Sequence, residues 1–299
     1  DDLRGHYITA EDSGTSVEDM EVIRTMTKHV TGVAPAQGGG GDPSPFTALG
    51  VRRGIEACVK FATGRDTLAD IHVAVQGVGH VGYHLCKELV AQGATLTVAD
   101  IDPLKAERAQ RDFGATIASL DDIFGVECDV FAPCALGSAL NSETIPRLKA
   151  KIVAGAANNQ LAHGEKHGKA LLDKGILYVP DYVINAGGLI NVANELEGYN
   201  RERALKQAEG IYSVVQEIIE VSKEEVAAYY DLHRSDYARP ARSQAAIVFF
   251  AVGADAPAER VAKVEARAAA ALAELKSLDP DPGHFGPVAR QHSDDRASR

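Results

Sequence analysis

Short apolar segments alternate with helical patterns through the middle of the chain. Residues 71–75 form a β-branched apolar run, and the helical pattern that follows passes through Leu85 and Leu89 and ends near Gly93, a residue suited to a helix C-terminus. Further strands are predicted at residues 95–100, 130–131, 151–154 and 176–179, with a helix over 103–113. This alternation predicts an α/β fold of Rossmann type, a doubly wound parallel sheet covered by helices on both faces.

Ahead of this region the pattern predicts two helices joined by a loop. The first begins after Ser16, whose hydroxyl can cap it, and its apolar residues Met20, Ile23 and Met26 recur at helical spacing. Residues 37–45 hold four glycines and two prolines, which indicates a loop with unusual backbone demands or a hinge. The second helix is expected from residue 46 to about residue 63.

After residue 200 the helical period returns. Residues 201–230 predict one long amphipathic helix, 244–252 a strand-like apolar run and 257–278 an alanine-rich helix. Residues 279–299 are rich in Pro, Gly, Asp, Arg and Ser, so we expect them to be disordered.

Composition and charge narrow the class of protein. The net charge of -11 argues against a nucleic-acid-binding surface, and no apolar run is long enough to cross a membrane. The first residues lack the basic and apolar regions of a signal peptide. The four cysteines include no CxxC pair and no histidine at metal-ligand spacing, which indicates free thiols in a reducing cytoplasm and no bound metal.

A glycine pattern follows the first predicted strand. Gly77, Gly79 and Gly82 match G-x-G-x-x-G at the junction of a strand and a helix, and the next strand ends in Asp100. This combination is typical of a dinucleotide-binding unit, in which the glycines let a pyrophosphate approach the helix N-terminus and the carboxylate binds the ribose hydroxyls. Asp100 would repel a 2′-phosphate, so NAD is favoured over NADP. A glycine-rich turn without a ligand is the alternative.

Three polar positions are open to two interpretations. Asp12 lies in a stretch of small neutral residues, where it fits an Asx turn or helix cap as well as a functional carboxylate. Asn158 and Asn185 follow predicted strands at their C-terminal ends, where ligands bind in open α/β sheets, but turn chemistry explains them equally well.

Six segments, taken together and in order, resemble the Glu/Leu/Phe/Val dehydrogenase family from residue 1 to about residue 225. They are residues 7–12 (YITAED), 43–48 (PSPFTA), 76–79 (QGVG), 132–135 (APCA), 155–159 (GAANN) and 180–188 (PDYVINAGG). Residues 182–200 are most similar to the leucine dehydrogenase branch, with the valine and phenylalanine branches close behind.

The resemblance implies reversible NAD-dependent oxidative deamination of an L-amino acid to the 2-oxo acid and ammonia, in a homo-oligomer. It implies that Asp12 exchanges protons with the substrate amine and that Asn185 lies beside the nicotinamide and the substrate. Thr47 would hold the nicotinamide carboxamide. Leu189 and Val192 would border an apolar pocket suited to a branched-chain substrate, leucine or valine. The cofactor site would also include Val81, Ala132, Pro133 and Asn158.

Members of this family carry two lysines ahead of the segment that corresponds to Asp12, one catalytic within a glycine-rich motif and one that binds the substrate carboxylate. The sequence given contains no such motif. Lys28 and Lys60 lie on predicted helices and are not part of a glycine-rich motif of this kind. Preorganised charge of this kind contributes several kcal/mol to transition-state stabilisation. We therefore expect this chain to bind NAD but to turn over slowly or not at all.

On this interpretation residues 1–40 are a remnant of a substrate-binding catalytic domain and residues 41–200 form the NAD-binding domain. Residues 201–235 are a helical return segment, and 236–299 are an atypical, partly disordered tail. Two alternatives stay open: a non-catalytic NAD-binding remnant, and a phenylalanine dehydrogenase.

Overall fold

The computed structural model describes residues 5–12 and 14–220, with five further positions between 262 and 273. Contacts divide the chain into two units, Asp1–Val226 and Ala227–Arg299. The strand expected at 244–252, the bounds of the helix expected at 257–278 and the disorder expected at 279–299 all lie outside the described residues. Within the described part of the chain, no helix combines the length and apolar character needed to cross a membrane.

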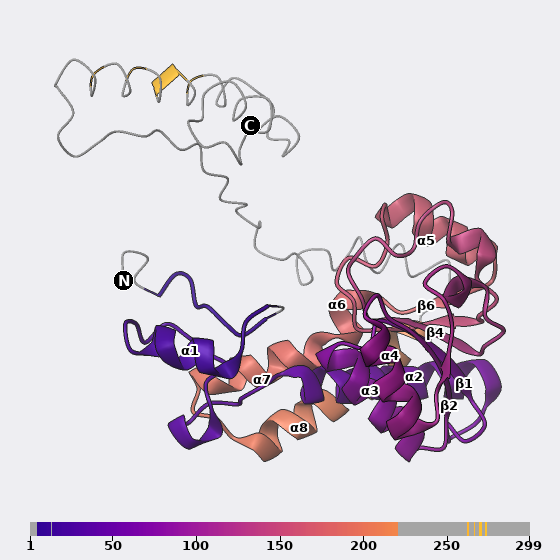
Figure 1. Ribbon diagram of the computed structural model, residues 1–299, viewed down its shortest axis with the longest axis horizontal. Helices are drawn as coiled ribbons and strands as arrows, with labels where there is room; N and C mark the ends of the chain where they lie inside the picture. The colour runs from indigo at the N-terminus through magenta and orange to yellow at the C-terminus, as the bar shows by residue number, and fades with distance from the viewer. Residues whose placement is uncertain are drawn as a thin grey trace. The chain divides into compact units, whose positions relative to one another are not determined.

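A six-stranded parallel sheet is at the centre of the first unit (Figure 1). The strands lie in the order β3-β2-β1-β4-β5-β6. Strands β1 to β3 are added toward one edge and β4 to β6 toward the other, so the order switches between β1 and β4, as in the doubly wound dinucleotide-binding fold. The Rossmann-type prediction is therefore confirmed. The strands are β1 (His72–Gln76), β2 (Thr95–Ala99), β3 (Thr116–Ile117), β4 (Val130–Pro133), β5 (Ile152–Val153) and β6 (Leu177–Tyr178).

The two faces of the sheet have separate cores because successive residues of a strand point in opposite directions. In β1, Val73 and Val75 belong to one buried cluster and Ala74 to the other. On the first face lie α2 (Ser44–Thr63), α3 (His80–Ala91) and α4 (Pro103–Phe113). On the other lie α5 (Gly164–Asp173) and two short 3-10 helices, Asp122–Gly125 and Ile145–Arg147 (Figure 1). We call residues 44–184 the sheet region.

Local capping signals explain why α4 begins and ends as expected. The Asp102 carboxylate accepts a hydrogen bond from the Leu104 N–H at 3.0 Å, Pro103 occupies the first helical position, and Gly114 ends the helix at φ 69°. Gly93, the residue expected to close α3, has φ 84° two residues after Ala91. Both helices match their predicted extents.

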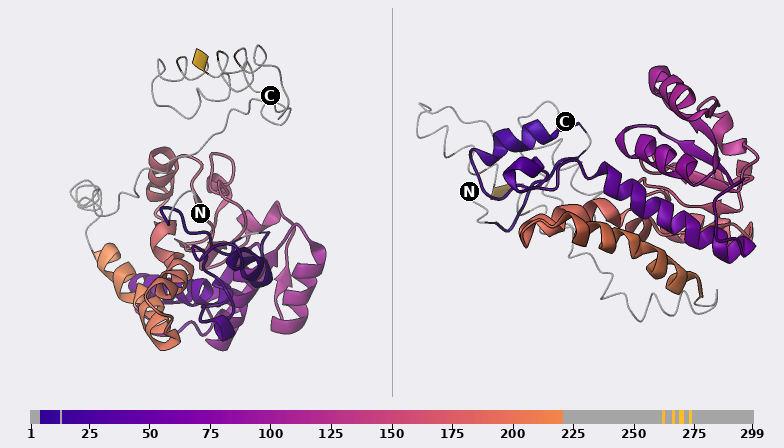
Figure 2. Two further views of the ribbon diagram at one scale, coloured as in Figure 1. Left: turned by 90° about the vertical axis from the view of Figure 1, so that its left-hand side faces the viewer. Right: turned by 90° about the horizontal axis from the view of Figure 1, so that it is seen from below.

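The long helix expected at 201–230 was wrong in its continuity, because Gly210 separates α8 (Arg201–Glu209) from α9 (Ile211–Glu220). Both helices pack on α2, but their other partners differ. α8 bonds to α7 (Ala186–Leu196) through Asn194 Nδ2 and Gln207 Oε1 at 2.7 Å, whereas Ile211 and Val215 of α9 join the main core beside α2 (Figure 2). The short helix α6 (Asp181–Ile184) precedes α7.

The N-terminal segment, residues 5–33, contains α1 (Val17–Arg24) and a parallel bridge between Thr9 and Val30. Ser16 caps α1 as expected, in a reciprocal capping box with Asp19. Met20 is buried, but Met26 is 81% exposed, because α1 ends at Arg24 before the apolar period reaches it. The helical pattern that the sequence showed through Met26 therefore extends beyond the end of the helix.

Candidate dinucleotide and substrate site

The glycine turn, residues 77–82, joins β1 to α3, and each glycine meets a different steric requirement. Gly77 has φ 92°, and a Cβ on it would lie 2.7 Å from the Ala135 backbone nitrogen. A Cβ on Gly82 would lie 2.0 Å from the Gly77 carbonyl oxygen. Gly79, in contrast, has no heavy atom within 4 Å of its Cβ position. Two glycines are thus required by the protein itself, and the third leaves space beside the start of α3.

The start of α3 has the properties of an anion-binding site. Gly79 is its N-cap and offers no side chain to satisfy the first-turn amides. These amides and the helix dipole favour negative charge next to the space left at Gly79. Val81, in the first turn, is half-buried. A pyrophosphate fits the chemistry of this position.

Asp100 follows the last residue of β2 and holds the glycine turn. Its Oδ2 accepts a hydrogen bond from the Val78 N–H at 2.7 Å, and its Oδ1 accepts one from the Asp102 N–H at 2.9 Å. A carboxylate has about four acceptor positions, so each oxygen keeps capacity for a ribose hydroxyl. The half-buried carboxylate is therefore both a structural tie and a candidate ligand.

The end of β4 lies directly beside the glycine turn. Ala132 pairs with Val75 and Pro133 with Gln76 in the parallel register, and both are buried. The Ala132 side chain belongs to the main core, so its contribution to a ligand site would come from the backbone. Burial raises the pKa of the neighbouring Cys134 thiol to about 12, which leaves it protonated at neutral pH.

The two asparagines that sequence reasoning left between turn and ligand roles lie against each other. Asn185 Nδ2 donates to Asn158 Oδ1 at 2.6 Å and to the Ala156 carbonyl at 3.3 Å. Asn158 is exposed in the loop after β5, and Asn185 is the N-cap residue of α7. The fold thus joins two loops that are separate in the sequence into one polar group.

Thr47 lies next to this group because α2 and α7 approach each other through glycine. A Cβ on Gly188 would lie 2.4 Å from Thr47 Oγ1, and one on Gly187 would lie 2.1 Å from the Phe46 carbonyl oxygen. The Thr47 hydroxyl donates to the Pro43 carbonyl at 3.1 Å. Thr47 and the start of α7 are therefore in contact, and the role of Thr47 at a nicotinamide stays a prediction.

Asp12 is exposed in the N-terminal segment, just before α1. Its backbone forms a turn with Thr15: the Asp12 N–H donates to Thr15 Oγ1 at 2.9 Å, and that hydroxyl donates to the Asp12 carbonyl at 2.8 Å. The pKa of the adjacent Glu11 is raised by burial and by the charge on Asp42, while His80 at the start of α3 opposes the shift. The segment that carries Asp12 is thus in electrostatic range of α3.

Leu189 and Val192 lie one turn apart on α7. Leu189 is 73% exposed, and Val192 is half-buried. An exposed leucine next to the Thr47 and Asn185 group is consistent with an apolar ligand contact, which stays a prediction.

Sequence reasoning assigned no role to Glu195, near the end of α7. Its carboxylate accepts backbone hydrogen bonds from Gly32 and Gly40, far away in the chain. No local pattern announces such a contact, because it depends on how three distant segments pack.

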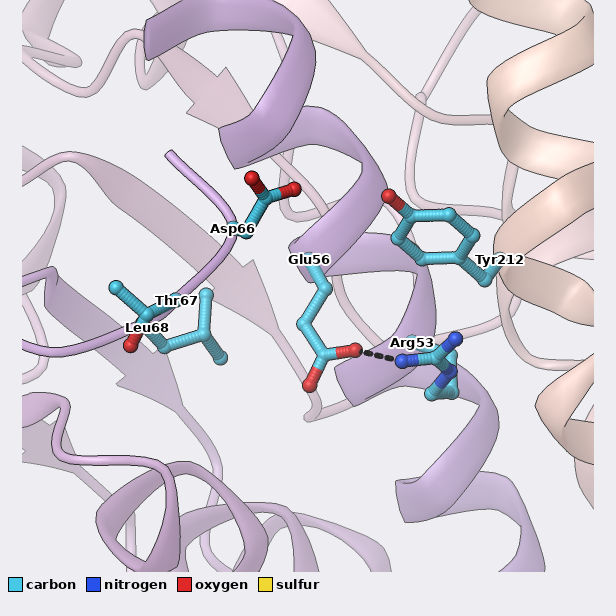
Figure 3. A pocket seen from close by; sticks show the side chains of 6 residues that line it. All are labelled: Arg53, Glu56, Asp66, Thr67, Leu68 and Tyr212. Carbon is cyan, nitrogen blue, oxygen red and sulfur yellow. Dashed lines mark hydrogen bonds and ion pairs between the residues drawn. The ribbon is translucent and has the colours of Figure 1, made fainter. Parts of the chain in front are cut away.

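A separate cavity of about 300 Å³ lies between α2, the loop that follows it and α9 (Figure 3). In it the Arg53 guanidinium lies 4.5 Å from the centre of the Tyr212 ring and pairs with Glu56. None of the predicted site residues lines this cavity. Its lining is Arg53, Glu56, Asp66, Thr67, Leu68 and Tyr212.

Comparison with known proteins places this geometry in context. The sequence profile of a family described as Glutamate/Leucine/Phenylalanine/Valine dehydrogenase matches residues 101–260. A leucine dehydrogenase of Thermoactinomyces intermedius is 60% identical over 221 residues, 74% of this chain and 60% of that protein. A valine dehydrogenase of Streptomyces albus is 45% identical over 226 residues, 75% of this chain and 62% of that protein.

A solved structure agrees with these sequence matches. The crystal structure of L-tryptophan dehydrogenase from Nostoc punctiforme is 45% identical, with a TM-score of 0.67 over 79% of this chain and 68% of that one. The chain spans about 60% of the length of the curated relatives named above. The curated relatives match 221 and 226 residues, close to the extent expected from the sequence, and the family profile continues to residue 260.

Proposed function

This chain belongs to the Glutamate/Leucine/Phenylalanine/Valine dehydrogenase family, and we propose that it serves NAD-dependent oxidative deamination of a branched-chain L-amino acid. In this reaction the amino acid, water and NAD⁺ give the 2-oxo acid, an ammonium ion, NADH and a proton. The observation that carries the proposal is the open position at Gly79, in the turn that follows β1, together with the contact between Asn158 and Asn185.

The chain's own residues fit the dinucleotide. The first turn of α3 would bind the pyrophosphate, and Asp100 would accept hydrogen bonds from the adenosine ribose. The carboxylate disfavours a 2′-phosphate, so NAD is proposed over NADP. When bound, the nicotinamide supplies the acceptor for the hydride that leaves the substrate Cα.

The remaining residues would position the reactants. Thr47 and Asn185 would hold the carboxamide end of the cofactor, and Asn158 supports the Asn185 amide at 2.6 Å. The Asp12 carboxylate would take a proton from the substrate amine and return one as the imine is hydrolysed. Such transfers require near-attack geometry, so the N-terminal segment and the sheet region have to enclose the substrate together.

The choice of substrate is the finer part of the proposal. Leu189 and Val192 present apolar surface on α7, which suits leucine or valine. Relatives named for leucine, valine and tryptophan share 45–60% identity with this chain. Because the aromatic alternative is represented among them, L-phenylalanine and L-tryptophan are the decisive competitors.

The test measures binding and turnover separately. Calorimetric titration with NAD and NADP is expected to give tighter binding of NAD, and NADH formation from L-leucine, L-valine, L-phenylalanine and L-tryptophan ranks the substrates. Slow turnover is the expectation for this 299-residue polypeptide, and rapid NADH formation would refute that part. Absence of NAD binding would overturn the function itself, and binding without any turnover would favour the non-catalytic alternative.

Asp12→Asn provides the matching variant. The change is expected to lower turnover about 10²- to 10⁴-fold, the usual contribution of a general acid–base group, and to leave NAD affinity unchanged. Glu18→Gln, which alters an exposed carboxylate of α1, is the control.

Two broader properties belong to the same proposal. The family resemblance supports a homo-oligomer, which light scattering of the purified chain would test. A cytoplasmic location suits four cysteines that are all free thiols.

A further inference from the structure

One carboxylate connects the segment that carries Asp12 to the helix that carries the proposed substrate contacts. Glu195 lies near the end of α7 and is half-buried. Its Oε1 and Oε2 accept hydrogen bonds from the Gly32 N–H at 3.0 and 3.1 Å, and Oε1 also accepts one from the Gly40 N–H at 2.8 Å. Figure 1 shows α7 extending from the sheet region toward the segment that holds α1.

The first of these contacts reaches Asp12 through its neighbour. Gly32 has φ 79°, and a Cβ on it would lie 2.9 Å from the Glu11 Cβ and 3.1 Å from the Glu11 nitrogen. Thr9 is also bonded to the residue that precedes Gly32, since the Thr31 N–H donates to the Thr9 carbonyl at 2.9 Å. The hydrogen bond to Gly32 therefore restrains the backbone at Glu11, the residue before Asp12.

The second contact fixes the glycine-rich loop that leads into α2. A Cβ on Gly40 would lie 2.6 Å from Asn191 Nδ2 and 2.9 Å from the Tyr199 ring, so the loop backbone packs directly on α7. Asn191 is fully buried, and its Oδ1 accepts a hydrogen bond from the Tyr199 hydroxyl at 2.8 Å. The sequence predicted a loop with unusual backbone demands or a hinge at residues 37–45, and in the structure Glu195 and Asn191 contact this loop at Gly40.

A carboxylate suits this position for a chemical reason. Both oxygens of an ionised Glu accept and neither donates, so one side chain can satisfy two backbone N–H groups. Hydrogen bonds to a charged acceptor are about twice as strong as neutral ones. A glutamine whose oxygen takes the Oε1 position would keep an acceptor for both N–H groups, but its NH₂ group would replace Oε2 and face the Gly32 N–H donor.

We propose that Glu195 is a positioning residue that sets the placement of Asp12 relative to Leu189 and Val192, by clamping Gly32 and Gly40 to α7. The proposal rests on the function proposed above and deepens it. Val192 and Glu195 are three residues apart on one helix, so the clamp and the proposed substrate pocket move as one body. A displacement of about 1 Å in such geometry lowers the rate of the chemical step by about 100-fold.

The test compares Glu195→Ala, Glu195→Gln and the control Glu197→Gln, which makes the same chemical change at an exposed position two residues away. Amide hydrogen exchange in the full chain is measured first. The Gly32 and Gly40 amides are expected to be protected in the wild type and in Glu197→Gln. They should lose protection in Glu195→Ala and keep part of it in Glu195→Gln, while exchange in β1 and α3 stays unchanged.

Kinetics and binding then separate positioning from general damage. Glu195→Ala is expected to lower kcat by about 10- to 100-fold, with Glu195→Gln recovering part of the loss, and with the NAD dissociation constant within about twofold of the wild-type value. Lost protection with unchanged kcat would overturn the positioning role, and unprotected amides in the wild type would overturn the clamp. If the wild type binds NAD but oxidises no amino acid, the non-catalytic alternative is favoured and the positioning role is overturned, whereas amide exchange still decides on the clamp.

Discussion

The sheet region and the N-terminal segment are each stabilised by a different kind of contact. The sheet region has a buried apolar cluster on each face of its six strands. The apolar core of the N-terminal segment consists of Met20, Val30 and Val33, with Ile23 packed against them. Its further attachment comes from the hydrogen bonds of Glu195.

This difference shows how the two regions can divide their tasks. A cofactor platform requires a rigid frame, which large apolar cores provide at native packing density. A segment with a small core opens at a lower free energy than the rest of the molecule. Polar contacts such as those of Glu195 can then define its position without making it part of the frame.

The largest expected effect comes from comparing two single substitutions in the glycine turn. Gly82→Val would place atoms where even a Cβ lies 2.0 Å from the Gly77 carbonyl oxygen, so we expect loss of NAD binding and destabilisation of the sheet region by about 3 kcal/mol or more. Gly79→Ala should fold normally, because nothing lies within 4 Å of its Cβ position. The methyl group would nevertheless occupy the pyrophosphate's path. Calorimetric NAD titration and urea unfolding of both variants measure the contrast, and a Gly79→Ala variant with wild-type NAD affinity would contradict it.

A cavity in the sheet region should destabilise the whole fold, whereas a cavity in the N-terminal segment should destabilise only that segment. Leu85→Ala removes a fully buried side chain of the main core and is expected to lower the free energy of unfolding by about 2–5 kcal/mol. Met20→Ala, in the small core, should mainly increase local opening of residues 5–33. Limited proteolysis is expected to cut the N-terminal segment of Met20→Ala while NAD affinity and the urea midpoint of the sheet region persist. Equal loss of both would mean that the two regions unfold as one unit.

Asp100→Asn tests the proposed cofactor site. The amide can accept one of the two backbone bonds but turns a donor toward the other N–H, and it removes the charge that binds ribose. Loss of about 1.5–3 kcal/mol corresponds to roughly 10- to 100-fold weaker NAD binding, with weaker discrimination against NADP. Asp102→Asn is the control, because Asn caps a helix as well as Asp does. If NAD affinity in Asp100→Asn equalled that in Asp102→Asn, Asp100 would have no cofactor role.

The smallest expected effect is a loss of folding stability at alkaline pH that is confined to the sheet region. Burial raises the pKa of the Cys58 and Cys86 thiols above the ordinary value of 9.0. A raised pKa in the folded state contributes stability that is complete below pH 9.0 and is lost as the pH rises above it. Each thiol should then cost about 1.4 kcal/mol per pH unit.

Urea unfolding at about pH 8 and about pH 10 measures this effect, and Cys58→Ala should reduce the difference between the two. The N-terminal segment contains no cysteine, so its amide exchange, corrected for the intrinsic pH dependence, should not share the change. The same pH dependence in Cys58→Ala as in the wild type would assign the effect to other groups.

The sequence predicted those parts whose signals are local. α4 has its exact bounds because Asp102, Pro103 and Gly114 act within a few residues of the ends they define. The glycine turn was recognisable for the same reason, since Gly77 and Gly82 are required by contacts inside the turn and with its immediate neighbours. The edge strand β3 was missed, because two exposed residues, Thr116 and Ile117, carry no apolar period.

The amino-acid sequence by itself determined the alternation of strands and helices, the glycine turn and the family, because periodicity, caps and glycines act over short distances. Only the tertiary structure decided the break at Gly210, the bond between Asn158 and Asn185, and the clamp of Glu195 on Gly32 and Gly40. Each of these depends on packing between segments far apart in the chain. A buried donor, for example, is satisfied by whichever acceptor the fold brings to it.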